Sequence, residues 1–152
     1  MKRHEALNPL SHHHHHTLMV SLELKRAGTE KSNKTYKELM FDVIKFWEED
    51  GENHFRDEEE ILFPLYLQHA NDPDINLVKE ALYQHTQVRA YVQQLRSTLK
   101  TQYEVMNELG QLLDDHVRLE ERELFPMIED AVPEKYLYQA NGKFHIDSFS
   151  GY

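Results

Sequence analysis

The sequence contains no cysteine. Disulfides, thiolate metal sites and cysteine nucleophiles are therefore excluded, and we expect a cytoplasmic protein, since cysteine-free chains suit a reducing compartment. No apolar run approaches the ~20 residues that cross a bilayer. The N-terminal residues, Met1 to Glu5, lack the apolar core of a signal peptide, so neither a membrane span nor a leader is expected.

Positive charge is scarce as well. The chain has 17 lysines and arginines against 27 aspartates and glutamates, which gives a formal net charge of −10. An acidic surface repels phosphate backbones and anionic lipids, so we expect no nucleic-acid partner and no membrane partner. The sequence also lacks a phosphate-binding glycine loop and a nucleotide fingerprint.

Glycine and proline occur only five times each, and the alternating pattern of β-strands is nearly absent. Apolar residues recur instead at helical spacing. The four helices expected from this spacing span about Leu10 to Ala27, Lys34 to Ala70, Asp74 to Leu99 and Thr101 to Asp130. We predict one domain in residues 1–135, an all-α, antiparallel up-down-up-down four-helix bundle, followed by a short C-terminal tail in residues 136–152.

Two segments of the predicted second and fourth helices are near copies of each other. His54 and Glu58 belong to the first copy, and His116 and Glu120 belong to the second. Both copies read His-x-x-x-Glu and continue to Leu-Phe-Pro at the same offset. Positions i and i+4 lie one turn apart on the same face of a helix. Each copy therefore directs one imidazole and one carboxylate to the same side.

Single histidines complete the pattern on the other two helices. His85 lies in the apolar stripe of the third helix, and a run of five histidines, residues 12–16, lies in the first. The apolar stripe of the first helix is drawn through Leu10, Leu18 and Leu22. His14 lies nearest the centre of that stripe, and His15 is the second choice. The run could also be the remnant of a purification tag, but its place inside an amphipathic pattern favours a ligand.

The heights of these residues along the bundle follow from the helical rise of ~1.5 Å per residue. Antiparallel packing brings His85 level with His116 and close to His54, whereas the first helix agrees less well with the second. A buried carboxylate is costly without a cation, and no lysine or arginine shares the faces of Glu58 and Glu120. A metal ion supplies the missing charge. The candidate metal ligands are His14, His54, Glu58, His85, His116 and Glu120.

Two carboxylates that can each bridge favour two metal ions over one. Carboxylate together with imidazole favours iron or manganese, with zinc as an alternative. The first two helices and the last two then form halves related by a pseudo-twofold axis, each holding one metal. Glu58 and Glu120 are the predicted bridges between the halves.

In these motifs the chain resembles the hemerythrin-like (HHE cation-binding) proteins, from Leu10 to about Glu129. The resemblance rests on the two His-x-x-x-Glu segments with Leu-Phe-Pro, on His85 and on the first-helix histidines. It implies a non-haem site of two iron ions, joined by an oxo or hydroxo bridge and by two carboxylates, inside a four-helix bundle. It also implies a protein that carries O2, senses oxygen or redox state, or handles iron.

The sequence departs from that family in two places. Hemerythrins themselves place two histidines four residues apart on the third helix, whereas here Ala81 stands four residues before His85. They also place the fourth-helix carboxylate five residues after its histidine, at the position of Glu121, although the helical angle favours Glu120. The resemblance therefore supports metal binding more strongly than reversible oxygen carriage.

Three functions are compatible with these residues. Histidine-rich ligation supplies fewer anionic donors than ferritin-like sites do, which favours binding of O2, peroxide or a diatomic ligand over the oxidation of difficult substrates. The alternative is a di-iron enzyme, an oxidase, peroxidase or nitric oxide scavenger, with the position left by Ala81 open to substrate. The third is a zinc-containing or metal-free helical interaction module.

Ordinary roles are expected for the other polar residues near these motifs. Surface positions are expected for His12, His13 and His16, and roles outside the site for His4, His69 and His145. Solvated helix faces are expected to hold Glu59, Glu60, Glu121 and Glu123. Proline lacks an amide hydrogen and kinks a helix. Such kinks are expected near Pro64 and Pro126, with a bend at Gly51.

Overall fold

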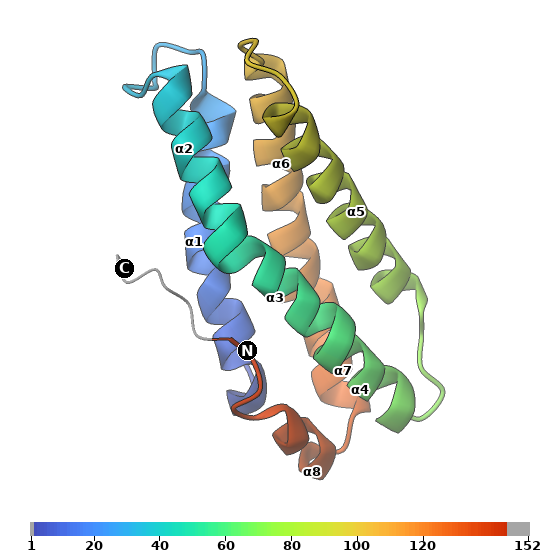
Figure 1. Ribbon diagram of the computed structural model, residues 1–152. Helices are drawn as coiled ribbons and strands as arrows, with labels where there is room; N and C mark the ends of the chain where they lie inside the picture. The colour runs from blue at the N-terminus through green and yellow to red at the C-terminus, as the bar shows by residue number, and fades with distance from the viewer. Residues whose placement is uncertain (1, 146–152) are drawn as a thin grey trace.

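The computed structural model describes residues 2–145, which form helices joined by loops (Figure 1). The four long helical stretches are α1 (Asn8–Arg26); α2, α3 and α4 (Tyr36–Phe46, Glu52–Asp57 and Phe63–His69); α5 (Asn76–Arg96); and α6 with α7 (Tyr103–Leu119 and Phe125–Ala131). Residues 2–145 contain no strand. The prediction of an all-helical bundle is therefore confirmed, and the second and fourth stretches agree with the predicted ranges to within two residues.

Figure 1 shows how the four stretches are joined. The α1–α2 and α5–α6 connections lie at one end of the molecule, and the α4–α5 connection lies at the other. The short helix α8 (Glu134–Leu137) packs at this second end against α4. Residues 146–152 of the predicted tail lie outside the described residues. Within residues 2–145, no helix is both long enough and apolar enough to cross a membrane.

Local signals fix where the helices begin and end. The Thr35 hydroxyl accepts a hydrogen bond from the Glu38 amide at 3.1 Å, and the Glu38 carboxylate accepts one from the Thr35 amide at 2.9 Å. This capping box starts α2. Pro9 lies in the first turn of α1, where its missing N–H costs nothing. Gly28, with a φ of +78°, takes the left-handed conformation that ends the α1 region.

The predicted kinks take the form of π-helical turns at Glu58–Leu62 and Glu120–Leu124. In each turn the amide of the phenylalanine before the proline bonds to the glutamate carbonyl five residues back. The wider turn accommodates a proline that can neither donate nor fit closely over the preceding turn. A third π turn, Trp47–Gly51, occurs where a bend was expected. Both glutamates predicted as bridges are thus the first residues of π turns.

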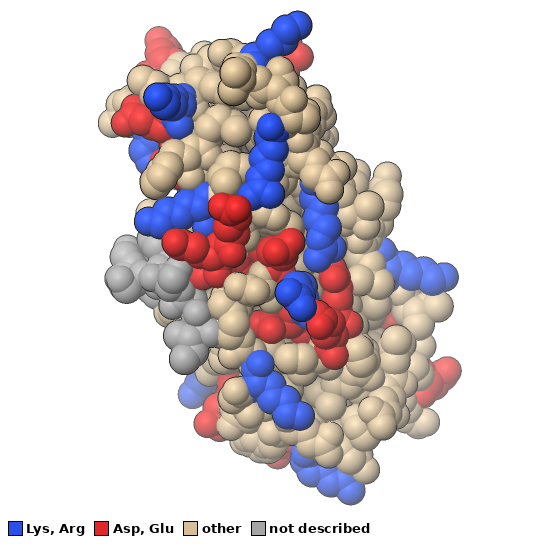
Figure 2. All heavy atoms as spheres, in the orientation of Figure 1, with Lys and Arg blue, Asp and Glu red and all other residues tan. Residues whose placement is uncertain are grey.

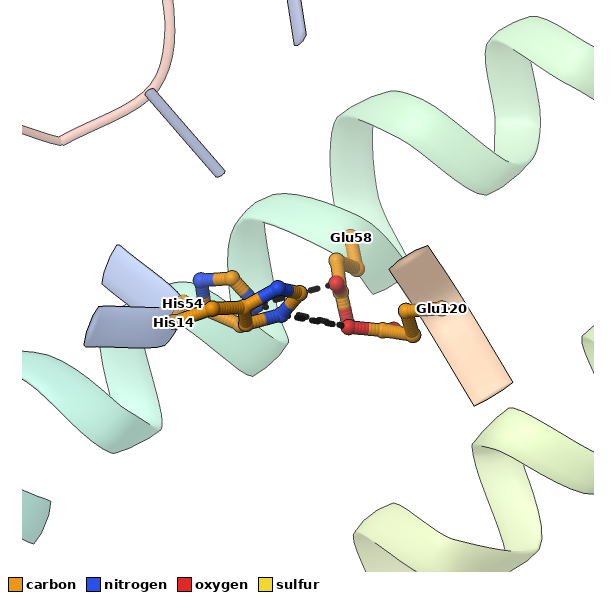
Figure 3. Close-up of side chains that lie close together, drawn as sticks. All are labelled: His14, His54, Glu58 and Glu120. Carbon is orange, nitrogen blue, oxygen red and sulfur yellow. Dashed lines mark hydrogen bonds and ion pairs between the residues drawn. The ribbon is translucent and has the colours of Figure 1, made fainter. Parts of the chain in front are cut away.

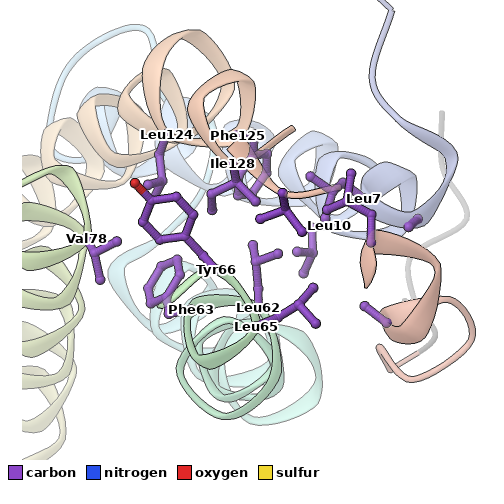
Figure 4. Close-up of a cluster of buried hydrophobic side chains, with 14 of the residues drawn as sticks. Leu7, Leu10, Leu62, Phe63, Leu65, Tyr66, Val78, Leu124, Phe125 and Ile128 are labelled. Atoms are coloured by element: carbon purple, nitrogen blue, oxygen red, sulfur yellow. The ribbon is translucent and has the colours of Figure 1, made fainter. Parts of the chain in front are cut away.

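Two clusters of buried apolar side chains fill the bundle, and the predicted site lies between them. One cluster, shown in Figure 4, includes Leu10, Leu62, Val78 and Leu124. The other includes Val20, Val43, Val88 and Leu113. On each of the four stretches the candidate ligands lie where the chain passes from one cluster to the other, with Phe55 and Leu119 among them. The polar layer therefore interrupts the core at one level of the bundle.

The apolar stripe predicted for the first helix was wrong. Leu18 is 40% exposed and Leu22 is 44% exposed. The buried face of α1 instead consists of Leu10, His13, His14, Thr17, Val20, Ser21 and Leu24. Ser21 on this face packs against α6, which approaches α1 closely at Gly110. The third helix also ends earlier than predicted, at Arg96, and leaves Leu99 exposed.

Candidate metal centre

The structure brings all six candidate ligands together in the interior. None of the six residues is more than 4% exposed. Their ligand atoms form two groups, each within 4.8 Å: His14, His54, Glu58 and Glu120 in one, and Glu58, His85, His116 and Glu120 in the other. Both glutamates belong to both groups. Figure 3 shows the first group, in which two imidazoles and two carboxylates point toward one another.

Each glutamate contacts one histidine of each half through different oxygens. Glu58 Oε2 lies 3.0 Å from His54 Nε2, and Glu58 Oε1 lies 2.8 Å from His85 Nε2. Glu120 Oε1 lies 3.0 Å from His14 Nε2, and Glu120 Oε2 lies 3.3 Å from His116 Nε2. This is the arrangement that two bridging carboxylates require, and it matches the predicted halves.

Four buried atoms of this cluster make no hydrogen bond, although each lies within 3.3 Å of another of the four. They are His54 Nε2, Glu58 Oε2, His116 Nε2 and Glu120 Oε2. An unsatisfied buried polar atom costs about 1–3 kcal/mol, and more where the group is charged. Four such atoms that point to one place fit a set of donors that complete their coordination on a cation. The residues present therefore fit a metal centre.

The structure also separates the alternatives that the sequence left open. His15 is exposed, whereas His14 is 3% exposed and contacts Glu120. Glu121 lies outside the cluster and accepts a hydrogen bond from His14 Nδ1 at 2.7 Å, whereas Glu120 lies within it. Ala81 is fully buried among apolar side chains.

Each of the four histidines has a partner for its outer nitrogen, Nδ1. The partner oxygens of the first three are Glu121 Oε2 for His14 (2.7 Å), Glu59 Oε2 for His85 (2.6 Å) and Gln84 Oε1 for His116 (2.7 Å). The partner of His54 is a nitrogen, His13 Nδ1, at 3.0 Å. A hydrogen on Nδ1 leaves the lone pair of Nε2 directed inward, where a metal needs it.

These partners correct the expectation that Glu59 and Glu121 lie on solvated faces. Both are partly buried, and each is held by an arginine as well as by its histidine. Arg89 donates to Glu59 at 2.9 Å, and Arg3 lies 3.3 Å from Glu121. Burial opposes ionisation, but these contacts outweigh it and lower the pKa of both carboxyls to about 2.

Two histidines expected outside the site also belong to its surroundings. His13 is 3% exposed, because the face of α1 that packs inward includes it. Its Nε2 lies 3.1 Å from the carbonyl oxygen of His145, whose ring stands over that of His13 at 4.2 Å between centroids. Burial, assisted by the nearby His54 and His145, lowers the pKa of His13 to about 2. The ring is therefore neutral.

The two glutamates of the cluster differ in their electrostatics. Burial and then repulsion from Glu120 raise the pKa of Glu58 well above its usual value. Burial also opposes the ionisation of Glu120, but the adjacent His116, His14 and His54 outweigh it and hold its pKa well below the usual range. Burial likewise disfavours the charged form of His14, yet hydrogen bonds to Glu120 and Glu121 raise its pKa to about 9.

These shifts predict that metal binding releases protons. At pH 7 the metal-free centre holds a proton on His14, whose pKa is about 9, and the raised pKa of Glu58 favours its protonated form. His14 must lose its proton to act as a ligand, and any proton on Glu58 adds to the release, so we expect at least one proton per chain to be released at pH 7 and apparent affinity to rise with pH up to about 9. Calorimetric titration in buffers of different ionisation enthalpy measures this release. Binding enthalpies independent of the buffer would contradict the prediction.

The pseudo-twofold relation extends to the positions of these partners, but the residue that follows the histidine of the motif differs between the two copies. In the first copy of the motif the residue after the histidine is Phe55, whose ring stacks on His85 at 3.9 Å between centroids. In the second copy it is Val117, which lines a groove of about 890 Å³. This groove lies between α1 and residues 141–145, and it reaches His14 and Glu121. The His85 half is thus covered by an aromatic ring, whereas the His14 half borders a groove.

The chain was compared with protein families, with curated proteins and with solved structures. The model of the hemerythrin HHE cation-binding domain matches residues 6–128, which include all six clustered side chains. The comparisons with curated proteins and with solved structures gave no match. With most of the chain matched, and with a buried His/Glu cluster of the kind that binds a cation, the chain belongs to the hemerythrin HHE cation-binding domain family.

Proposed function

We propose that the chain is a non-haem protein that holds two iron ions and binds O2 or another small ligand at them. His14 and His54 would hold one ion, His85 and His116 the other, and the two glutamates would bridge them. The observation that carries the proposal is the pair of glutamates whose oxygens divide between the halves, together with the unpartnered nitrogens and oxygens that point to the centre. The placement of the connecting loops supports the antiparallel order predicted for the four stretches.

The donor set favours iron or manganese over the metals preferred by thiolates, because it consists of imidazole and carboxylate. Bound iron would supply a redox-active centre with a position for a small ligand. The protein would orient the imidazoles through their outer partners and exclude water with apolar side chains on both sides. The groove beside His14 and Glu121 supports entry of the ligand from that side, since Phe55 covers the His85 half.

Surface charge supports uptake of a cation. Figure 2 shows acidic side chains gathered over the middle of the face that α2 and α3 present. Between the end of α2 and the end of α3, residues 47–57, the exposed acidic residues are Glu48, Glu49 and Glu52. A region of negative potential raises the local concentration of metal ions. His54 and Glu58 lie buried in the same stretch of helix.

Metal content tests the proposal directly. Protein purified without a nickel column and reconstituted anaerobically with Fe(II) is expected to hold about two iron ions per chain. His14→Ala is expected to lose at least one, because His14 contacts Glu120 in the interior. His15→Ala, the matched control in the same run, is expected to keep both, because His15 is exposed. Elemental analysis provides the count.

Other metal contents distinguish the remaining functions. Less than about half an iron per chain after reconstitution would contradict iron binding and leave the zinc-containing or metal-free interaction module. Where iron binds, a stable and reversible visible absorption band on adding O2 supports ligand binding. Irreversible oxidation together with turnover of peroxide or nitric oxide above that of His54→Ala supports the enzyme, a function that the groove beside His14 also permits.

A further inference from the structure

The outer hydrogen bond of His54 differs in kind from those of the other three histidines. His14, His85 and His116 each meet an oxygen, which can only accept, so their Nδ1 atoms must donate. His54 Nδ1 meets the imidazole nitrogen of His13 at 3.0 Å. A neutral imidazole nitrogen can donate or accept. This contact alone therefore leaves open which nitrogen of His54 keeps its hydrogen.

The other nitrogen of His13 resolves this. His13 Nε2 lies 3.1 Å from the carbonyl oxygen of His145, which can only accept, so Nε2 must carry the hydrogen. The ring of His13 is buried and its two nitrogens meet an imidazole and a carbonyl rather than a carboxylate, so the ring is neutral with one hydrogen, which leaves Nδ1 as an acceptor. His54 Nδ1 must then donate to it. The lone pair of His54 Nε2 is consequently directed toward Glu58.

The carbonyl that starts this chain of hydrogen bonds is itself held in place. The backbone amide of His145 donates to Asp57 Oδ2 at 2.9 Å, and its ring Nδ1 lies 3.1 Å from the same oxygen. Asp57 directly precedes Glu58 on the second helical stretch. The segment after α8 is thereby anchored beside the helix that bears His54 and Glu58.

We propose that His13 is a positioning residue that fixes the tautomer of His54, and that the His145 carbonyl makes the C-terminal segment part of the His14/His54 half of the centre. This inference rests on the proposed function, because the tautomer matters only where Nε2 binds a metal. It assigns to one half a dependence on the chain's C-terminal segment that the other half lacks. In the other half the equivalent partner of His116 is Gln84, on α5.

Gln84 supplies the comparison for the experiment. It immediately precedes His85, as His13 immediately precedes His14, and its amide oxygen accepts from His116 at 2.7 Å. Glutamine at position 13 can therefore accept from His54 in the same way, without help from His145. Phenylalanine at position 13 retains a buried ring but cannot accept. His13→Gln and His13→Phe thus separate the acceptor from the packing.

Anaerobic titration with Fe(II) alone, combined with 15N NMR of the histidines in metal-free protein, tests the proposal. We expect His13→Phe to lower the affinity for one of the two irons by about 10- to 100-fold and to leave the other unchanged. His13→Gln is expected to stay within about threefold of the wild type at both. In the NMR spectrum, His54 is expected to carry its hydrogen on Nδ1 in the wild type and in His13→Gln. In His13→Phe that hydrogen is expected to exchange between Nδ1 and Nε2.

Other results overturn the inference. Wild-type affinity for both irons in His13→Phe would do so, as would an equal loss in His13→Gln, since either means that the acceptor is unimportant. If His13→Phe does not fold, Asp57→Ala provides the same test, because it frees the His145 carbonyl and leaves the ring of His13 in place. Unchanged binding of both irons by Asp57→Ala would then overturn the proposal. A wild type that binds no iron refutes the proposed function, whereas an Nε2-protonated His54 refutes the positioning role alone.

Discussion

Glu58→Gln is expected to abolish binding of the metal pair and to leave the metal-free fold at least as stable as the wild type. Glu58 contacts both halves of the centre, through Oε2 to His54 and through Oε1 to His85. An amide removes the negative charge and one of the two donor oxygens that a bridge uses. Each metal that no longer binds removes about 4 kcal/mol of stabilisation at a free concentration 1,000 times its Kd, or roughly 8 to 16 °C in Tm.

Without metal, Glu58→Gln is expected to change the stability of the fold in the opposite direction. The pKa of Glu58 is raised, so its ionisation destabilises the fold as pH rises above the ordinary carboxyl value of 4.5. Glutamine resembles the protonated form and removes this dependence. Thermal unfolding with and without metal, at several pH values between 6 and 9, measures both effects. Glu60→Gln is the matched control, because Glu60 lies in the same π turn and is exposed. Its carboxylate accepts a hydrogen bond from Arg56, outside the cluster.

Glu120→Gln is expected to behave differently in the metal-free protein, although the two bridges are equivalent by pseudosymmetry. The pKa of Glu120 is held low, so its charge contributes stability above pH 4.5 that is lost on acidification. Removing that charge leaves the protonated His14 without its buried partner. Both variants lose the metal pair, but only Glu120→Gln is destabilised without metal. Retention of both metals by either variant would contradict the assignment of the bridges.

Five of the six clustered side chains could be predicted from the sequence because periodicity and level determine them jointly, whereas His14 followed from a stripe in which two of the three leucines are exposed. The His-x-x-x-Glu spacing places each pair on one face, and the rise per residue sets the height of His85 against His116. The proline kinks could also be anticipated, since proline removes a fixed hydrogen bond. The i→i+5 bonds that replace it depend on the local widening of the helix and leave no separate signal in the sequence.

The outer partners of the histidines were missed, although a signal for them exists. Glu59 and Glu121 each follow a bridging glutamate, and His13 and Gln84 each precede a single histidine. These shared offsets would have selected all four. On a single helix, however, adjacent residues point ~100° apart, so each partner appears solvated until the neighbouring helix is placed. His145 offers no such offset, because it meets Asp57 across 88 positions of sequence.

The error in the first helix has a different cause. Apolar periodicity assigns the leucines to the buried face of α1, whereas the structure buries Thr17 and Ser21 and exposes Leu18 and Leu22. Small side chains permit a closer approach to a neighbouring helix than leucines do. That approach occurs at Gly110 of α6, where the Ser21 hydroxyl donates to the Gly110 carbonyl at 2.7 Å. A periodicity argument that counts only apolar residues cannot find such a contact.

Gly110→Ala is therefore expected to destabilise the protein, although alanine normally stabilises a helix interior relative to glycine by up to about 1 kcal/mol. A Cβ at this position would lie 2.8 Å from the Ser21 carbonyl oxygen and 2.8 Å from the Lys25 nitrogen, both backbone atoms of α1. Backbone cannot rotate away, so α1 must shift, at a cost of about 2–3 kcal/mol. Because α1 bears His13 and His14, the His14/His54 half is expected to lose its metal first.

Denaturant unfolding and iron content provide the measurements. The control is Asp115→Ala at an exposed position, whose free energy of unfolding is expected within about 0.5 kcal/mol of the wild type. A stabilised Gly110→Ala would mean that the helices can separate freely at this point, and the close approach would then have no part in positioning the centre.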